Sequence, residues 1–300
     1  MKIIATMPVR NEDWVLGLSA RAALMWCDEL VIGLHACTDA SEAIAVKVAH
    51  ESEGRVTLIR YDDPVWHEMA HRQTLLETAR QRGATHIAIV DADEVLTSNL
   101  LLTIRGHFEA TPRHSVLQIP WLALRGSIGQ VHTSGPWADG QNVSTGFVDS
   151  PQLHWAARNG YDFHHRHPMG RPCVPFLPVS DRNAGLLHLQ FVSGRRLRAK
   201  QALYKMIEVL RWPDREPVHM VDRRYNLSVY GSMVPSDGWQ ERQDATLSPA
   251  PLNDWWGAYA NLLHHFHPHA TPWQETEVWR LVEIHGRSRF AGLDLFGVDS

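Results

Sequence analysis

Three acidic residues follow a run of apolar residues in the stretch "HIAIVDADEVL", residues 86–96. Asp91 and Asp93 are two positions apart, so they share one side of the chain while it stays extended. Two converging carboxylates suit a hard divalent cation, Mg²⁺ or Mn²⁺, which prefers oxygen ligands and keeps positions open for substrate phosphates. The alternative is a solvated loop before a helix that Asp93 or Glu94 caps. We predict a Mg²⁺ or Mn²⁺ site with Asp91 and Asp93 as ligands.

The acidic residues end the last of four expected strands, and helices alternate with these strands. Apolar runs predict strands at residues 2–9, 29–35, 55–62 and 86–93. Apolar stripes and cap residues predict helices at residues 13–26, 39–54, 64–82 and 97–110. Such alternation is typical of an α/β fold with a mainly parallel, Rossmann-type sheet that helices flank on both faces.

Polar residues follow each of the four strands. They lie in "RNED" (10–13), "HACTD" (35–39), "YDD" (61–63) and "DADE" (91–94). The opposite edge of the sheet, where the strands begin, offers mostly Lys2, Glu29, Arg55 and His86 and no comparable cluster. Because ligands of parallel sheets bind beyond the carboxyl ends of the strands, we expect the functional site at the first edge.

The composition limits the classes of partner. The 300 residues carry 29 basic and 33 acidic side chains, a net charge of -4, and this balance argues against nucleic acid as the main partner. No apolar run is long enough for a membrane span and the start of the chain does not resemble a signal peptide, so we expect a cytoplasmic protein without integral membrane contact. Cys27, Cys37 and Cys173 are widely spaced and odd in number, which favours free thiols.

Four motifs in order carry a resemblance to a known family. "IIATMPVRNEDWVL", "LHACTDAS", an arginine in the following helix and "IVDADEVL" together resemble the nucleotide-sugar domain of family 2 glycosyltransferases with the GT-A fold, and "LLHLQF" extends the likeness. The resemblance implies transfer of a sugar from a nucleoside diphosphate sugar to an acceptor hydroxyl, with inversion. It also implies a metal-binding DxD motif at Asp91, Ala92 and Asp93, whose cation bridges the diphosphate of the donor.

The resemblance assigns further residues to the donor. The nucleotide pocket is expected at "PVRNE", which is Pro8, Val9, Arg10, Asn11 and Glu12. Arg72 is expected on the diphosphate side of the nucleotide.

One departure concerns the base of the nucleotide. Family members commonly carry two acidic residues at the end of the second strand, and one contacts the base. Here Leu34 and His35 occupy the acidic places, while Asp39 is retained. We place His35 and Asp39 in the nucleotide site and leave the identity of the base open.

A histidine and a basic cluster follow in the second half of the chain. In similar enzymes a downstream histidine is a third metal ligand, which here is His188; the alternative is a histidine packed in the core. Arg195, Arg196, Arg198 and Lys200 follow closely. We predict that Arg195 and Lys200 neutralise the diphosphate, although the cluster also fits a solvated helix face.

An inverting transfer needs a carboxylate as general base. Asp162, beside the histidines of "DFHHRHP", is the first candidate and Asp149 the second. Neither "DFHHRHP" nor "LLHHFHPH" has the H-x-x-x-H spacing of a helical zinc site, and we interpret most of these histidines as surface or pocket residues.

The rest of the chain predicts two further regions after a nucleotide-sugar-binding subdomain at 1–115. Residues 116–212 are expected to form a mixed acceptor and catalytic region, with strands at 114–124 and 184–192 and a helix from Ser193 to before Pro213. Residues 213–300 are expected to form a C-terminal helical extension, with helices near 253–267 and 273–286 that either cover the acceptor site or mediate a homodimer.

Two other functions remain open at this stage. A nucleotidyltransferase can use a related sheet with Mg²⁺, although it usually carries a glycine-rich signature and a lysine near the N-terminus. A non-catalytic module that binds sugar nucleotides or carbohydrate is the other alternative. The acceptor hydroxyl is unknown.

Overall fold

The computed structural model describes residues 1–113, 115–132, 142–170, 174–178, 184–230, 247–249 and 265–300. The chain divides into two compact units. The first comprises residues 1–121, 142–187 and 251–267, and the second comprises residues 122–141, 188–250 and 268–300.

Four parallel strands form one half of the sheet in the first unit. They are β1 (Ile3–Val9), β2 (Glu29–His35), β3 (Val56–Tyr61) and β4 (His86–Ile89). β1 pairs with β2 on one side and with β4 on the other, and β2 pairs with β3, so the order is β3-β2-β1-β4. The first three strands lie where the sequence predicts them, and β4 begins as predicted but ends at Ile89 instead of residue 93.

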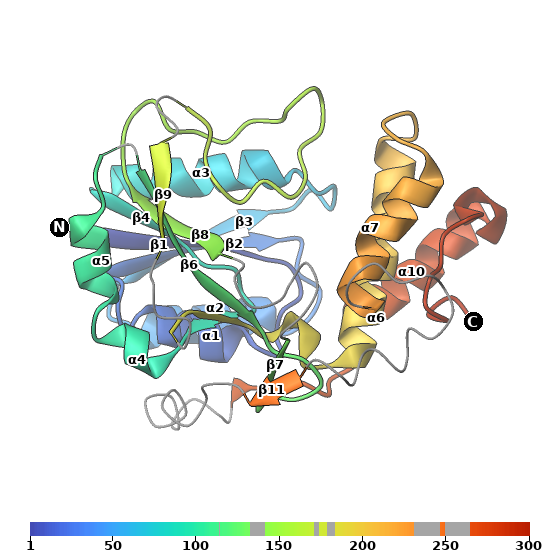
Figure 1. Cartoon of the computed structure of the whole chain (residues 1–300), viewed down its shortest axis with the longest axis horizontal. Helices are drawn as coiled ribbons and strands as arrows, with labels where there is room; N and C mark the ends of the chain where they lie inside the picture. The colour runs from blue at the N-terminus through green and yellow to red at the C-terminus, as the bar shows by residue number, and fades with distance from the viewer. Residues whose placement is uncertain (114, 133–141, 171–173, 179–183, 231–246, 250–264) are drawn as a thin grey trace. The chain divides into compact units, whose positions relative to one another are not determined.

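Helices cover both faces of these strands, as Figure 1 shows. They are α1 (Leu16–Ala23) and α2 (Ser41–Glu51) on one face and α3 (Glu68–Gln81) on the other. Neighbouring residues of β1 therefore join different clusters of the core: Ile3 packs with Leu16 of α1, and Ile4 packs with Leu75 of α3. The predicted α/β class, with a mainly parallel sheet between helices, is confirmed.

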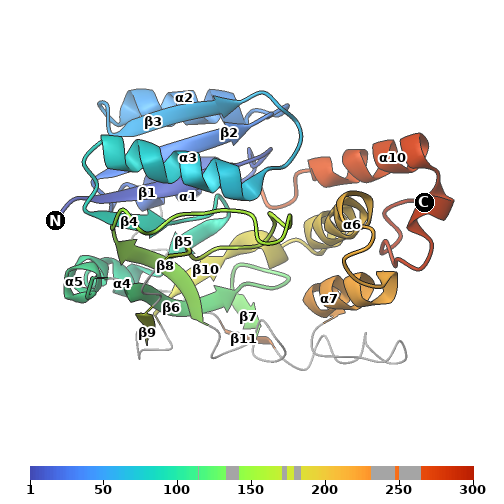
Figure 2. The ribbon, with the colours of Figure 1, turned by 90° about the horizontal axis from the view of Figure 1, so that it is seen from above.

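The sheet continues beyond β4 in a mixed arrangement (Figure 2). Among the described residues it has nine strands, and the further ones are β5 (Glu94–Leu96), β6 (Ser115–Ala123), β8 (Asn142–Val148), β9 (Val174–Pro178) and β10 (Leu186–His188). β8 runs antiparallel to both β4 and β6. Gly146 permits the close approach of β8, because a Cβ there would lie 2.6 Å from the carbonyl oxygen of Ile87.

Two predicted elements differ from the structure. The helix expected at 97–110 is two helices, α4 (Ser98–Leu101) and α5 (Ile104–Ala110). The strand expected at 184–192 is only β10, followed by a 3-10 turn, η1 (Leu189–Phe191). This segment is buried throughout, and an apolar run without alternation does not distinguish a strand from a buried helical turn.

The described part of the second unit is mainly helical. It contains α6 (Gly194–Arg211), α7 (Val218–Tyr230), α10 (Trp273–His285), the 3-10 turn η4 (Arg287–Phe290) and the paired strands β7 (Gln130–His132) and β11 (Leu247–Pro249). α6 begins as predicted, with the Ser193 hydroxyl accepting from Arg196 N at 3.3 Å. The sequence did not predict α7, and the helix expected near 253–267 falls largely outside the described residues. None of the described helices is both long and apolar enough to cross a membrane.

Candidate active site

The strand order reverses between β1 and β4. The chain passes outward from β1 to β2 and β3, and then returns to place β4 on the other side of β1. Ligands of open α/β sheets bind beyond the carboxyl ends of the strands at such a reversal. The segments that leave the two neighbouring strands there are residues 10–13 after β1 and residues 91–94 after β4. Two of the predicted motifs therefore flank the place where this fold binds ligands.

The acidic residues after β4 form a closed turn. Glu94 N donates to the carbonyl oxygen of Asp91 at 3.1 Å, and Asp91 N donates to Oε2 of Glu94 at 2.9 Å. The segment is therefore a turn, and the prediction that Asp91 and Asp93 share one side of an extended strand is wrong. Asp93 is 4% exposed and Glu94 is 0% exposed, whereas the side chain of Asp91 is 29% exposed, so the turn is buried except at Asp91.

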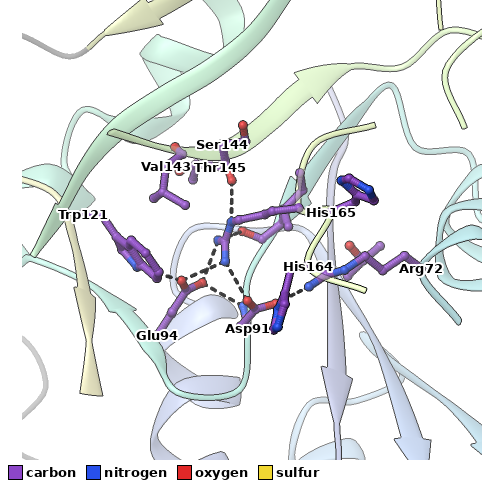
Figure 3. A network of polar contacts seen from close by, with 12 residues as sticks. Arg72, Asp91, Glu94, Trp121, Val143, Ser144, Thr145, His164 and His165 are labelled. Atoms are coloured by element: carbon purple, nitrogen blue, oxygen red, sulfur yellow. Dashed lines mark hydrogen bonds and ion pairs between the residues drawn. The ribbon is translucent and has the colours of Figure 1, made fainter. Parts of the chain in front are cut away.

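Two arginines neutralise this turn. Nη2 of Arg72, on α3, donates to Oδ1 of Asp91 at 3.1 Å. Arg166 donates to Oδ2 of Asp91 at 2.7 Å and to Oε2 of Glu94 at 2.7 Å. Figure 3 shows Arg72 pointing toward Asp91 from one side of the turn and Trp121 pointing toward Glu94 from the other. Side chains of the protein itself therefore supply much of the positive charge near these acids.

Acidic and basic side chains alternate in one series of contacts, which we call the charged chain. It runs from Glu68 through Arg72, Asp91 and Arg166 to Glu94. Oε1 of Glu68 accepts from Nε of Arg72 at 3.0 Å, and Trp121 donates its indole N–H to Oε1 of Glu94 at 3.0 Å. Burial by itself would raise the pKa of Asp91, but Arg166 and Arg72 outweigh burial and hold that pKa below its usual value. Burial would likewise lower the pKa of Arg72, but Asp91 and Glu68 raise it above its usual value. Asp91 is therefore an anion, and it is fixed between two cations.

The segments after β1 and β2 are tied together by three of the predicted nucleotide-site residues. Asn11, with φ 54, accepts from Thr38 N at 2.7 Å and donates to Thr38 Oγ1 at 3.0 Å. Glu12 N donates to Ser41 Oγ at 2.8 Å. Asp39 accepts from Ser41 N at 2.9 Å and from the backbone N–H that follows Glu12 at 3.1 Å. These residues shape the backbone at the strand ends, and Pro8 and Val9 lie in β1.

His35 lies at the end of β2 in a group of rings. Nη1 of Arg10 is 3.4 Å from each ring nitrogen of His35, and His35 Nε2 is 2.8 Å from the carbonyl oxygen of Asp63. The rings of Trp66 and His71 lie 5.7 Å and 4.6 Å from that of His35. Burial, and then the charge of Arg10, lower the pKa of His35 to about 4. The imidazole of His35 is therefore neutral at pH 7.

The two candidate bases lie at different edges of the sheet. Asp162 is 9% exposed, and its Oδ2 is 3.5 Å from Nδ1 of His67, just before α3. Asp149 N donates to the carbonyl oxygen of Thr85 at the start of β4, and its carboxylate accepts from Nε of Arg80 at 3.0 Å and from Nη2 at 2.8 Å. Asp162 therefore lies beside the N-terminal end of α3, which is the end near the acidic turn. Asp149 is bonded at the opposite edge of the sheet.

The opposite edge is richer in ion pairs than the sequence indicated. Glu29 pairs with both Lys2 and Arg82, and Arg80 pairs with Asp149. Arg80 lies in the last turn of α3 and Arg82 directly follows that helix, six and four residues before β4 begins. Our expectation of no comparable cluster there considered only the residues at the strand starts.

Three predicted site residues belong to the second unit. His188 is 6% exposed, and its ring meets that of Phe191 edge-on at 5.2 Å. Arg195 makes a bidentate ion pair with Glu275, with both contacts at 2.6 Å, and Lys200 Nζ lies 5.9 Å from the ring centre of Tyr204. The roles of His188, Arg195 and Lys200 at a metal or a diphosphate stay predictions.

The donor atoms at the turn suit a cation that takes most of its ligands from a substrate. In the described part of the chain, no three His, Cys, Asp or Glu side chains gather closely enough to hold a metal ion. Both carboxylate oxygens of Asp91 already accept from guanidinium groups. Mg²⁺ and similar ions are commonly held by one or two carboxylates, with phosphates and water as the remaining ligands. The roles of Asp91 and Asp93 as metal ligands stay predictions.

The sequence interpretation missed two residues of the charged chain, Glu68 and Arg166. Glu68 has the i,i+4 spacing of a helical ion pair with the predicted Arg72, so a signal for it was present in the sequence. Arg166 lies among the histidines of "DFHHRHP", and no spacing relates it to Asp91, which is 75 residues away. Only the folded chain brings them together.

No protein-family model and no curated protein matches this sequence. Among solved structures, the chain is similar to S. aureus TarS 1-349 at 12% identity and a TM-score of 0.44, over 97% of this chain and 88% of that one. The complex of the same protein with UDP matches at 11% identity and a TM-score of 0.41, with the same coverage. Glucosyl-3-phosphoglycerate synthase from Mycobacterium tuberculosis, in complex with Mn²⁺, UDP and phosphoglyceric acid, matches at 13% identity and a TM-score of 0.29, over 41% of this chain and 43% of that one. At such identities and TM-scores these similarities assign the chain neither a family nor an activity.

Proposed function

We propose that this chain is a GT-A-type glycosyltransferase of the family 2 kind, which moves a sugar from a nucleoside diphosphate sugar to an acceptor hydroxyl. The observation that carries the proposal is the pairing of β1 with β4. It brings the "RNED" and "DADE" segments to the two sides of the point where the strand order reverses. A fixed acidic turn at that point suits the diphosphate of a donor together with a divalent cation.

The chain's own residues would prepare the donor for transfer. Asn11, Glu12 and Asp39 hold the two segments that would line the nucleotide, and Arg72 orients Asp91. Asp93 would hold Mn²⁺ or Mg²⁺, which supplies positive charge to the departing nucleoside diphosphate when bound.

Asp162 is the proposed general base. It would accept the proton of the acceptor hydroxyl while the oxygen attacks the anomeric carbon and the nucleoside diphosphate leaves, so the anomeric configuration would invert. His67 Nδ1, 3.5 Å from Asp162 Oδ2, would orient this carboxylate. Asp149 is less suited to act as the general base, because both of its carboxylate oxygens accept from Arg80.

The nucleobase of the donor is expected to differ from the nucleobases that an acidic side chain recognises. A neutral His35 ring, with Arg10 and Trp66 beside it, occupies the corresponding place. The carbonyl oxygen of Asp63 can only accept, so Nε2 is the donor of the neutral ring and Nδ1 alone is left as an acceptor, where a carboxylate would offer two oxygens. The donor panel should therefore include UDP, GDP, ADP, CDP and dTDP sugars.

The test is incubation of the chain with that panel and Mn²⁺, with separate assays for nucleoside diphosphate and pyrophosphate. Slow release of nucleoside diphosphate without an acceptor would support the transferase. Release of pyrophosphate from a nucleoside triphosphate and a sugar phosphate would instead show a nucleotidyltransferase. Thermal stabilisation by a sugar nucleotide with no turnover, even with a panel of acceptors, would show a binding module.

A further inference from the structure

Arg166 is the most completely bonded side chain near the acidic turn. Nη1 donates to Asp91 Oδ2 at 2.7 Å and to Glu94 Oε1 at 2.8 Å, and Nη2 donates to Glu94 Oε2 at 2.7 Å and to the carbonyl oxygen of Ile89 at 3.1 Å. Nε donates to the carbonyl oxygen of Ser144 at 2.8 Å. A guanidinium has five N–H groups, and here each has an acceptor within the chain. Arg166 has no donor left for a substrate.

These contacts join three parts of the first unit. Ile89 ends β4, Ser144 lies in β8, and Asp91 and Glu94 form the turn. Arg166 itself belongs to the segment between β8 and β9. One side chain therefore fixes the turn against the two strands beside it.

The same segment is fastened at a second point. The backbone N–H of His164 donates to Oε2 of Glu68 at 3.0 Å, and Glu68 Oε1 holds Arg72. Asp162 lies two residues before His164 and four before Arg166. The segment that carries the proposed general base is thus bonded to the charged chain at two residues, His164 and Arg166.

We propose that Arg166 is a positioning residue, which fixes the turn from Asp91 to Glu94 and fastens to it the segment that carries Asp162. This role rests on the proposed function, and it links the donor side of the site to the side of the base. Lysine cannot take the place of Arg166, because an ammonium has three N–H groups and no planar fork that reaches two carboxylates and two carbonyls at once. Small displacements of aligned groups reduce rates strongly.

The test compares Arg166→Lys with Arg80→Lys. Arg80 is a matched control in the same unit, since it also makes an ion pair with a carboxylate, Asp149, and donates to the carbonyl oxygens of Ser150 and Leu153, but at the opposite edge of the sheet. Arg166→Lys is expected to lower kcat on the order of 100-fold, as a displaced reacting group does, with a smaller rise in the KM for the donor. Arg80→Lys is expected to lower the melting temperature and leave kcat and KM near the wild-type values.

Glu68→Gln is the second variant, and it replaces the first if Arg166→Lys does not fold. It weakens the attachments of His164 and Arg72 and leaves the five bonds of Arg166 in place, so kcat should fall by a larger factor than the donor KM rises. Wild-type kcat and KM in the folded Arg166→Lys variant would overturn the role of Arg166, and so would equal losses in Arg80→Lys. If Arg166→Lys does not fold, a wild-type kcat in Glu68→Gln would overturn the fastening of the segment. Absence of turnover in the wild-type chain with every donor would instead overturn the proposed function itself.

Discussion

The two edges of the parallel sheet both carry arginine and carboxylate pairs, but the pairs differ in how deeply they are buried and in the number of cations that meet each acid. At the amino edge, Glu29 meets two cations, Lys2 and Arg82, whose side chains are each 37% exposed. At the carboxyl edge, Glu94 is 0% exposed and its partner Arg166 is 16% exposed. Exposed pairs contribute little to stability, whereas a buried carboxylate requires its partners. The comparison indicates that charge at the amino edge stays near water, whereas charge at the carboxyl edge is held in a fixed, buried arrangement.

The largest expected effect concerns the buried acid of the turn. Glu94→Gln removes a charge from beside Arg166 and turns an amide NH₂ toward groups that already donate. Breaking a buried ion pair in this way costs about 3–5 kcal/mol of unfolding free energy. Urea unfolding followed by circular dichroism measures the loss. A loss no larger than that of an exposed pair would remove the difference between the edges.

The next effect is on catalysis. Asp93→Asn keeps the shape of the side chain and removes its charge, so it should lower kcat/KM for the donor on the order of 100-fold, as the loss of one electrostatic contact to a transition state does. Chelation of divalent metal with EDTA should reduce the activity of the wild-type chain to a similar level. Steady-state release of nucleoside diphosphate is the measurement, with Glu109→Gln, an exposed acid on α5, as the control. Full metal-dependent activity in Asp93→Asn would contradict the assignment of the cation to Asp93.

How far the sequence predicted the structure also differs between regions. The parallel strands were predictable because each is an apolar run that caps and helices bound, and the strand ends then identified the functional edge. Arg166 and the Glu68 contact to His164 were not predictable, because they join residues far apart in sequence through an irregular segment. The helix α7 was predictable in part, because Val221, Tyr225 and Val229 recur every four residues and are buried, although its β-branched residues lower its helix propensity. The three-part division at residues 115 and 212 stays a prediction.

A smaller effect concerns pH. Burial, followed by neighbouring His35 and His67, lowers the pKa of His71 to about 4, and Arg10 lowers it slightly further while Asp63 opposes the shift. An unfolded histidine titrates near pH 6.5, so the unfolded state binds the proton first as pH falls. The stability from a neutral His71 is complete above pH 6.5 and is lost as the pH falls toward 4. His71→Phe preserves a ring against Tyr61, whose ring lies 4.1 Å away, and should flatten this loss in urea unfolding at pH 7 and pH 5. An unchanged pH dependence would contradict a neutral His71.

The smallest effect is expected at the amino edge. Glu29→Gln leaves Lys2 and Arg82 partly exposed to water, so the change in unfolding free energy should be about 0–1 kcal/mol. The same urea unfolding measures it. A loss as large as that of Glu94→Gln would show that the two edges are equivalent in stability.

Calorimetric titration of nucleoside diphosphates, with and without Mn²⁺, tests the central claim most directly, because it needs neither the acceptor nor the sugar. The wild-type chain and Glu29→Gln should bind one nucleoside diphosphate per chain with an affinity that Mn²⁺ increases, and Asp93→Asn should lose that increase. Equal affinity and equal metal dependence in Asp93→Asn would contradict a donor site at the carboxyl edge.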